Sequence, residues 1–282
     1  MMAHSLDRQS ITGEDYRAFR DVLEKMCGIV LGDGKEYLLA SRLSGLLREY
    51  HLDSFRALLG RLRTGDPKLR TSVIDAMTTN ETFWFRDTAH FRLLAERVLP
   101  DLRPPLGQPV RIWSAACSTG QEPYTISMTV QNYLSRNPGR LPAGVEILAT
   151  DISSKVLAEA RSGAYCGFNV SRGLEPSQQR QFFQPKGSCL EVRPEIRRRV
   201  QFREFNLTSG FALLGRFDII FCRNVLIYFS AALKADVINR MAQVLNPGGF
   251  LFLGSTEAIT GHLDRFDMVN ACGGIAYRVR PR

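Results

Sequence analysis

The hydrophobic positions of the chain follow two different periods. From residue 14 to about residue 79, apolar side chains recur three and four residues apart, as Tyr16, Phe19 and Leu23 do, which is typical of amphipathic helices. Breaks rich in glycine at 32–34 and 64–67 separate these segments. We therefore predict an all-α N-terminal domain over residues 1–79, with helices that begin near Thr12, around Leu38, at Ser54 and at Pro67.

From residue 110 onward the pattern alternates between strands and helices. We predict strands at 110–114, 146–151, 200–205, 217–222 and 249–254, helices at 121–134, 154–161 and 231–245, and a C-terminal hairpin over 266–279 turned at Gly273–Gly274. Runs such as FDIIFC are apolar on both faces, as in a covered parallel strand. The alternation predicts a Rossmann-like α/β domain over 110–282, interrupted by an insertion at about 163–199 and preceded by a linker over 80–109.

Composition narrows the class of protein. Hydrophobic residues make up 44% and charged residues 23%, as in ordinary globular proteins. The N-terminus lacks the apolar core of a signal peptide, no apolar run has the ~20 residues of a membrane helix, and we expect a cytoplasmic protein. Six scattered cysteines without a CxxC pair argue against a metal site or a disulfide framework. The net charge of +9 fits either nucleic acid or an acidic protein partner.

The segment RIWSAACSTGQEPY, Arg111–Tyr124, is the most informative candidate site. An apolar strand runs into a turn of small residues and then a helix, and the next strand ends on Asp151. Backbone amides of such a turn can approach a ligand closely, and the acid can accept both hydroxyl hydrogens of a ribose. The turn contains one glycine, Gly120, so it lacks the usual GxGxxG spacing. Glu122 lies in the first helical turn, where interaction with the helix dipole is an alternative role.

Two further clusters lie where strands and linkers end. TTNETFWFRD, Thr78–Asp87, is either a buried aromatic hinge or a recognition segment in which Arg86 meets a carboxylate or a base. CRNVLIYF, Cys222–Phe229, follows a predicted strand at the edge where α/β proteins bind ligands. There Asn224 and Tyr228 either contact a cofactor or serve as a turn residue and a core residue.

The helical domain carries much of the positive charge. Between Arg42 and Arg70 the chain has seven basic and three acidic residues. A solvated helix face is the usual explanation of such charges, and a docking surface for an acidic partner is the competing one.

Taken in order, the blocks TTNETFWFRD, WSAACSTGQEPY, ATDIS, ARSGAY, FDIIFCRNVLIYF and LNPGGFLFLGSTE resemble those of the CheR-type chemotaxis-receptor glutamate methyltransferases. The resemblance covers essentially the whole chain. It implies a class I S-adenosylmethionine methyltransferase domain with a small β-subdomain, which would methylate receptor glutamates to γ-glutamyl methyl esters during sensory adaptation. The implied partner is the cytoplasmic methylation region of membrane-bound receptor arrays, reached through the basic helices.

The resemblance also implies roles for particular residues. The family's cofactor contacts fall on Asn80, Thr82, Arg86, Glu122, Asp151, Asn206, Leu207, Arg223 and Asn224. Asp151 would hold the ribose, and Asn206 and Leu207 would lie near the adenine. Arg86 and Tyr228 match the pair nearest the transferred methyl group, and no metal is implied.

One segment departs from the family pattern. The connection Phe183–Leu190 is about three residues shorter than in members whose β-subdomain grips a peptide at the receptor C-terminus. We therefore expect a protein that does not depend on such a tether. Two other functions stay open, a methyltransferase that acts on nucleic acid and an adaptor that binds the cofactor without transferring its methyl group. Neither an NPPY-like loop nor an RNP aromatic motif is present to favour nucleic acid.

Overall fold

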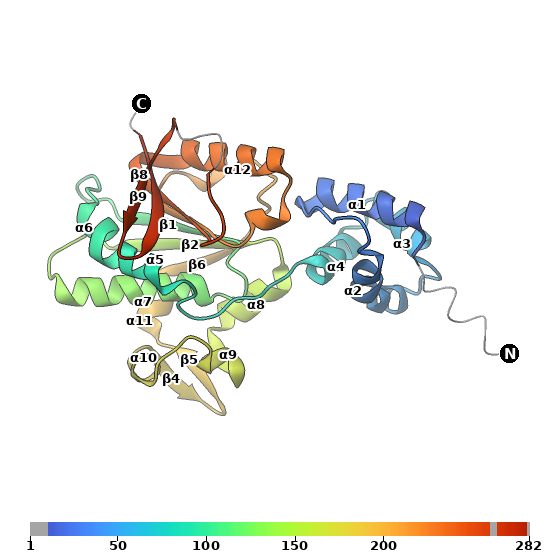
Figure 1. Cartoon of the computed structure of the whole chain (residues 1–282). Helices are drawn as coiled ribbons and strands as arrows, with labels where there is room; N and C mark the ends of the chain where they lie inside the picture. The colour runs from blue at the N-terminus through green and yellow to red at the C-terminus, as the bar shows by residue number, and fades with distance from the viewer. Residues whose placement is uncertain (1–10, 260–263, 281–282) are drawn as a thin grey trace.

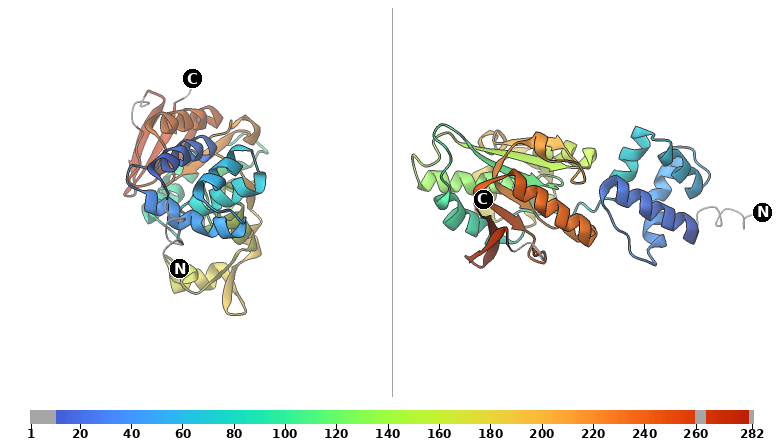
Figure 2. Two further views of the ribbon diagram at one scale, coloured as in Figure 1. Left: turned by 90° about the vertical axis from the view of Figure 1, so that its right-hand side faces the viewer. Right: turned by 90° about the horizontal axis from the view of Figure 1, so that it is seen from above.

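The computed structural model describes residues 11–259 and 264–280. A helical domain stands to one side of a larger α/β domain, and a small subdomain projects from the latter (Figure 1). The right-hand view of Figure 2 shows the helical domain beside the α/β domain. Within the described residues, none of the helices combines the length and the apolar character that crossing a bilayer requires.

The helical domain contains the four predicted helices. They are α1 (Gly13–Cys27), α2 (Glu36–Glu49), α3 (Phe55–Arg63) and α4 (Pro67–Met77). Side chains of Thr12, Ser54 and Asp66 cap the first, third and fourth helices by accepting backbone N–H groups. The apolar stripes meet in one core that includes Phe19, Leu43 and Val73. The periodicity of the sequence therefore fixes both the helices and the faces that they bury.

A seven-stranded sheet forms the centre of the α/β domain, in the order β6-β2-β1-β7-β8-β10-β9. Its strands are β1 (Val110–Ala115), β2 (Val145–Asp151), β6 (Val200–Glu204), β7 (Phe217–Cys222), β8 (Leu245–Leu253), β9 (Phe266–Ala271) and β10 (Gly274–Val279). The first five are parallel, whereas β10 runs antiparallel to both β8 and β9. The strand order reverses between β1 and β7, which is where open α/β sheets bind ligands.

Helices cover both faces of this sheet. They include α7 (Gln121–Arg136), α8 (Ser154–Ser162) and α12 (Ala231–Val244). Alternate residues of β7 enter different cores: Ile220 packs with α12 residues, and Phe221 packs with Ile126 of α7. The continuous apolar run FDIIFC is therefore explained by burial on both faces, as predicted.

The structure corrects two details of the predicted elements. Residues 88–101, assigned to the linker, are helical throughout, as α5 (Thr88–Leu93), the π-helix η2 (Leu94–Val98) and α6 (Leu99–Asp101). The C-terminal hairpin forms, but Cys272 and Gly273 make its turn, with φ of 55° and 74°, because Gly274 already pairs with Ala271. Apolar residues such as Leu94 and Val98 gave the helical signal, which the nearby prolines obscured.

The insertion forms a small subdomain with a three-stranded sheet in the order β3-β5-β4. Its elements are β3 (Ala164–Cys166), α9 (Phe168–Ser171), α10 (Pro176–Phe182), β4 (Phe183–Lys186), β5 (Cys189–Val192) and α11 (Pro194–Arg197). Cys166 and Cys189 are joined by a disulfide, so the expectation of no disulfide was wrong for this pair. Antiparallel pairing places these two residues opposite each other although 23 positions separate them, which spacing alone did not reveal.

Candidate cofactor site

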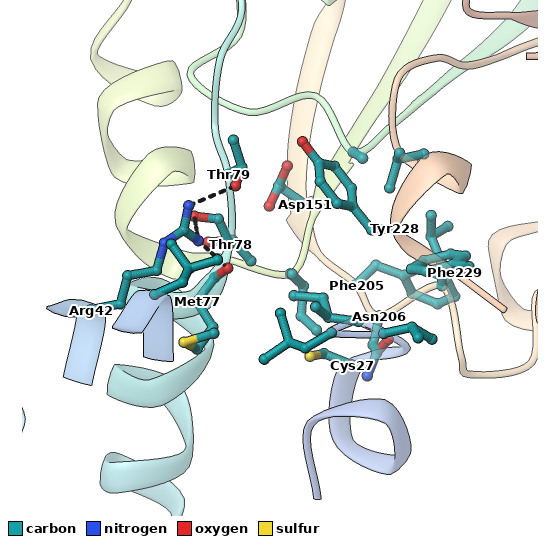
Figure 3. Close-up of a pocket in the computed structure, with 18 of the residues that line it drawn as sticks. Cys27, Arg42, Met77, Thr78, Thr79, Asp151, Phe205, Asn206, Tyr228 and Phe229 are labelled. Carbon is teal, nitrogen blue, oxygen red and sulfur yellow. Dashed lines mark hydrogen bonds between the residues drawn. The ribbon is translucent and has the colours of Figure 1, made fainter. Parts of the chain in front are cut away.

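A cavity of about 160 Å³ lies at the carboxyl edge of the sheet, between the α/β domain and the helical domain. Its lining is mostly apolar with a few polar groups, as is usual for cofactor sites. Four residues predicted as site residues line it, namely Asp151, Asn206, Leu207 and Tyr228. Figure 3 shows Asp151 and Tyr228 on one side of this cavity and Arg42 on the other.

Asp151 ends β2 with its carboxylate buried at the rim of the cavity. Its Oδ2 accepts the backbone N–H of Ser118 at 2.8 Å, and its Oδ1 accepts that of Ser153 at 3.0 Å. Burial raises the pKa of this carboxyl, although the hydrogen bonds from the Ser153 and Ser118 amides oppose that effect. Each oxygen keeps a second lone pair, so the group can accept two further hydrogen bonds from a ligand.

The turn before α7 owes its shape to three residues with positive φ. Ala116, Ser118 and Gly120 have φ of 57°, 50° and 94°. At Gly120 a Cβ atom would lie 2.9 Å from the Ala160 Cβ and 3.0 Å from the Tyr165 hydroxyl, so a side chain is excluded there. The small residues at the other two positions tolerate the left-handed conformation, which explains how the turn forms with a single glycine.

The helical domain completes the wall of the cavity. Arg42 of α2 donates to the Met77 carbonyl at 2.5 Å and to the Thr79 hydroxyl at 2.9 Å, and it lines the cavity. Asn206 donates its amide to the Met26 carbonyl at 2.8 Å, and the Val30 N–H donates to the Tyr228 carbonyl at 2.9 Å. The bonds of Asn206 and Val30 cross between the domains and hold them around the cavity. Sequence analysis assigned Arg42 to a docking surface and missed this role.

Glu122 and Arg223 lie beneath the cavity in a buried network rather than in its lining. Arg223, whose side chain is 2% exposed, donates to Glu122 at 2.9 Å and to Asp87 at 2.7 Å. It also donates to the Arg86 carbonyl at 2.6 Å. Glu122 accepts a further hydrogen bond from the Ser114 hydroxyl at 2.7 Å. This network ties the segment that carries Arg86 to the first strand and its helix.

The remaining predicted residues lie on the segments around the cavity. The Arg86 guanidinium donates to the Glu81 carbonyl at 3.0 Å and lies 5.6 Å from the centre of the Phe83 ring. The Asn80 carbonyl accepts the Ser118 hydroxyl at 2.9 Å, which connects this segment to the turn. Asn224 has a positive φ of 58°. Asn80, Thr82, Arg86 and Asn224 are partly buried but do not line the cavity itself.

The donor set of the cavity fits S-adenosylmethionine. The buried carboxylate of Asp151 suits a ribose, and apolar groups of Leu207 and Phe229 suit a purine face. The small-residue turn lets backbone amides approach a ligand, as its positive φ values show. Burial raises the pKa of Cys27, which lines the cavity, and raises that of Cys117 and Cys222 well above the usual value, so the neutral thiol is favoured in all three.

Comparison with known proteins identifies the two domains. Residues 14–78 match the family model described as "CheR methyltransferase, all-alpha domain", and residues 80–275 match "CheR methyltransferase, SAM binding domain".

Relatives match along nearly their full length. A chemotaxis protein methyltransferase 1 of Pseudomonas aeruginosa is 48% identical over 273 residues, which cover 96% of this chain and 100% of the relative. A chemotaxis protein methyltransferase of Vibrio parahaemolyticus is 48% identical, over 96% of this chain and 98% of the relative. One of Salmonella typhimurium is 35% identical, over 93% of this chain and 89% of the relative. The chain therefore belongs to the CheR methyltransferase family and is an S-adenosylmethionine-dependent methyltransferase.

Proposed function

We propose that this protein methylates glutamate side chains of bacterial chemotaxis receptors and thereby forms γ-glutamyl methyl esters during sensory adaptation. The observation that carries the proposal is the cavity between the domains, which Asp151 and Tyr228 line on one side and Arg42 on the other (Figure 3). Relatives named chemotaxis protein methyltransferases support a substrate in chemotaxis. The substrate glutamates would lie in the cytoplasmic part of the receptors, so the protein would work beside the receptor arrays.

The side chains of the protein would bind the cofactor and orient the substrate carboxylate. Asp151 would hold the ribose hydroxyls, and Asn206 and Leu207 would place the adenine. S-adenosylmethionine supplies a methyl group on a cationic sulfur, which a carboxylate oxygen displaces with loss of a neutral thioether. A solvent-exposed glutamate has a pKa of about 4.3, so it arrives ionised and needs no general base. In-line positioning then provides most of the acceleration, and it can contribute roughly 7–11 kcal/mol.

Arg86 and Tyr228 are proposed to set this line of approach. Arg86 is held by one hydrogen bond to a carbonyl and by the Phe83 ring, so its guanidinium retains donors for a carboxylate. A moderate contact is required, because strong stabilisation of the carboxylate would reduce its nucleophilicity.

We expect both Arg86→Ala and Tyr228→Phe to lower kcat for receptor methylation by about 100-fold, since each removes an orienting contact. The measurement is initial transfer rate from labelled cofactor at saturating receptor fragment. Arg136→Ala, at an exposed position in the last turn of α7, is the control and should behave as the unchanged protein. Near-normal turnover in both site variants would remove the two residues from the mechanism.

The proposed docking surface consists of Arg48, Arg63, Lys68 and Arg70, all exposed on the helical domain. The other basic residues of this stretch are engaged within the domain: Arg42 binds the segment after α4, Arg56 pairs with Asp15 at 3.0 Å, and Arg61 pairs with Asp66 at 2.7 Å. Across residues 11–259 and 264–280, no ion pair involves the four surface residues. They are thus available to an acidic receptor helix.

Independence from a receptor tether is a further proposal. Strands β4 and β5 pair up to Lys186 and Cys189, so only Gly187 and Ser188 form the turn between them. The proposal rests on the shortness of this connection relative to the peptide-gripping members of the family. We expect no complex at micromolar concentration between this protein and a synthetic receptor C-terminal peptide, measured by calorimetry beside a peptide-gripping relative. Binding at about 1 μM, worth about 8 kcal/mol, would contradict the proposal.

Incubation with labelled S-adenosylmethionine tests the function as a whole. The acceptors are receptor cytoplasmic fragments in one reaction and RNA in another. Base-labile label on the receptor is expected, because esters hydrolyse in alkali whereas methylated bases and amines do not. Label on RNA, or cofactor binding without transfer to either acceptor, would overturn the proposal.

A further inference from the structure

Glu257 lies in the turn that follows β8, at the same edge of the sheet as the cofactor cavity. It ends the block LGSTE, residues 253–257. The Glu257 N–H donates to the Gly254 carbonyl at 2.9 Å, and this bond folds the chain back toward the strand. The carboxylate is thereby directed at the neighbouring segment after β7, which carries Asn224 and Tyr228.

Three backbone amides converge on the Glu257 carboxylate. Its Oε2 accepts the N–H of Asn224 at 2.6 Å and that of Gly254 at 2.8 Å, and its Oε1 accepts the N–H of Ile227 at 3.3 Å. None of the ion pairs in the described part of the chain involves Glu257. The carboxylate therefore interacts with backbone N–H donors and not with a cationic side chain. Hydrogen bonds to a charged acceptor are stronger than those between neutral groups.

These bonds hold a segment that begins with a residue in the left-handed conformation. Asn224 has φ of 58°, a conformation that residues other than glycine adopt only when their surroundings hold them. The short helix η4 (Leu226–Tyr228) follows, and its first turn contains the Ile227 N–H that Glu257 accepts. The fit is tight, because a Cβ atom on Gly254 would lie 2.6 Å from Glu257 Oε2 and 3.0 Å from the Asn224 nitrogen.

We infer that Glu257 is a positioning residue for methyl transfer, which acts by holding the backbone of Asn224 and Ile227 and thereby the neighbouring Tyr228 at the cavity. The inference rests on the proposed function, because it assumes that Tyr228 contributes to transfer. Glu257 does not line the cavity. Its effect on the reaction passes through the backbone of the segment that it binds.

Kinetics of two Glu257 variants test this inference. Glu257→Ala is expected to lower kcat about 100-fold, since displacement of catalytic groups by roughly 1 Å has that effect. The KM for receptor should stay within about threefold, because docking relies on another domain. Glu257→Gln should recover kcat to within about tenfold of the unchanged protein, since its amide oxygen can still accept the Asn224 and Gly254 amides. Glu146→Ala, at an exposed position in β2, is the matched control.

Two further measurements separate positioning from folding. In a Tyr228→Phe background, Glu257→Ala should cost about tenfold instead of about 100-fold, because residues that act as a unit are not additive. Cofactor titration without receptor should show about tenfold weaker binding in Glu257→Ala, the loss of about one hydrogen bond. This titration still tests the inference if the protein methylates another acceptor. An unchanged kcat or an unchanged cofactor affinity in Glu257→Ala would overturn the inference. So would a kcat of Glu257→Gln no higher than that of Glu257→Ala, or a double variant whose loss of kcat equals the product of the two single losses.

Discussion

Asp151→Asn is expected to weaken S-adenosylmethionine binding about 100-fold, or about 3 kcal/mol, the loss of charged hydrogen bonds to a ribose. The asparagine amide would also place N–H donors against one of the two backbone amides, from Ser118 or Ser153, that the carboxylate now accepts. The turn that contacts the cofactor would therefore shift as well. Calorimetric titration of the cofactor measures the effect directly.

Asp218→Asn provides the matched control for this variant. Asp218 accepts the backbone N–H of Arg111 at 2.8 Å and the side chain of Asn246 at 2.8 Å, at the opposite end of the sheet. Both variants thus lose a carboxylate that binds backbone, but only Asp151→Asn loses one that faces the cavity. Equal cofactor affinity in the two variants would show that Asp151 supports the fold without holding the ribose.

The sequence was sufficient to predict Asp151, because strand ends in a parallel sheet converge at one edge. Asn206 also lines the cavity, but it was predicted from the family resemblance. The rule that placed Asp151 at this edge also placed Tyr228, which lines the cavity too. These predictions depend on local patterns and on one topological rule. The helical periods of the N-terminal domain are local in the same sense, and all four helices formed.

Contacts between distant segments could not be read in this way. Arg42 reaches carbonyl groups 35 residues away, and its charge alone suggested a surface role. Glu257 binds an amide 33 residues away, in a motif whose order was informative but whose contacts were not. The disulfide between Cys166 and Cys189 likewise depends on strand pairing inside the insertion. Each case requires the register of two segments, which hydrophobic periodicity does not specify.

Arg223→Met is expected to lower the free energy of unfolding by about 3–5 kcal/mol, the cost of removing one partner of a buried ion pair. The guanidinium joins Glu122 and Asp87, whose side chains are 13% and 26% exposed. Burial by itself would raise the pKa of Asp87, but the hydrogen bond and charge of Arg223 outweigh burial and lower it. The stabilisation that the ion pair between Asp87 and Arg223 provides is present at neutral pH, and it is lost as the pH falls through the lowered pKa of Asp87. Urea unfolding at neutral pH measures the difference.

A triple variant distinguishes the charge of Arg223 from its hydrogen bond to the Arg86 segment. In Arg223→Met combined with Glu122→Gln and Asp87→Asn, no unpaired buried charge remains, so about half or more of the lost stability should return. The rate of methyl transfer should not return, because the triple variant still lacks the hydrogen bond that Arg223 donates to the Arg86 carbonyl at 2.6 Å. Recovery of transfer together with stability would mean that Arg223 only balances charge. Recovery of neither would mean that packing against Phe91, 5.5 Å from the guanidinium, is the main contribution.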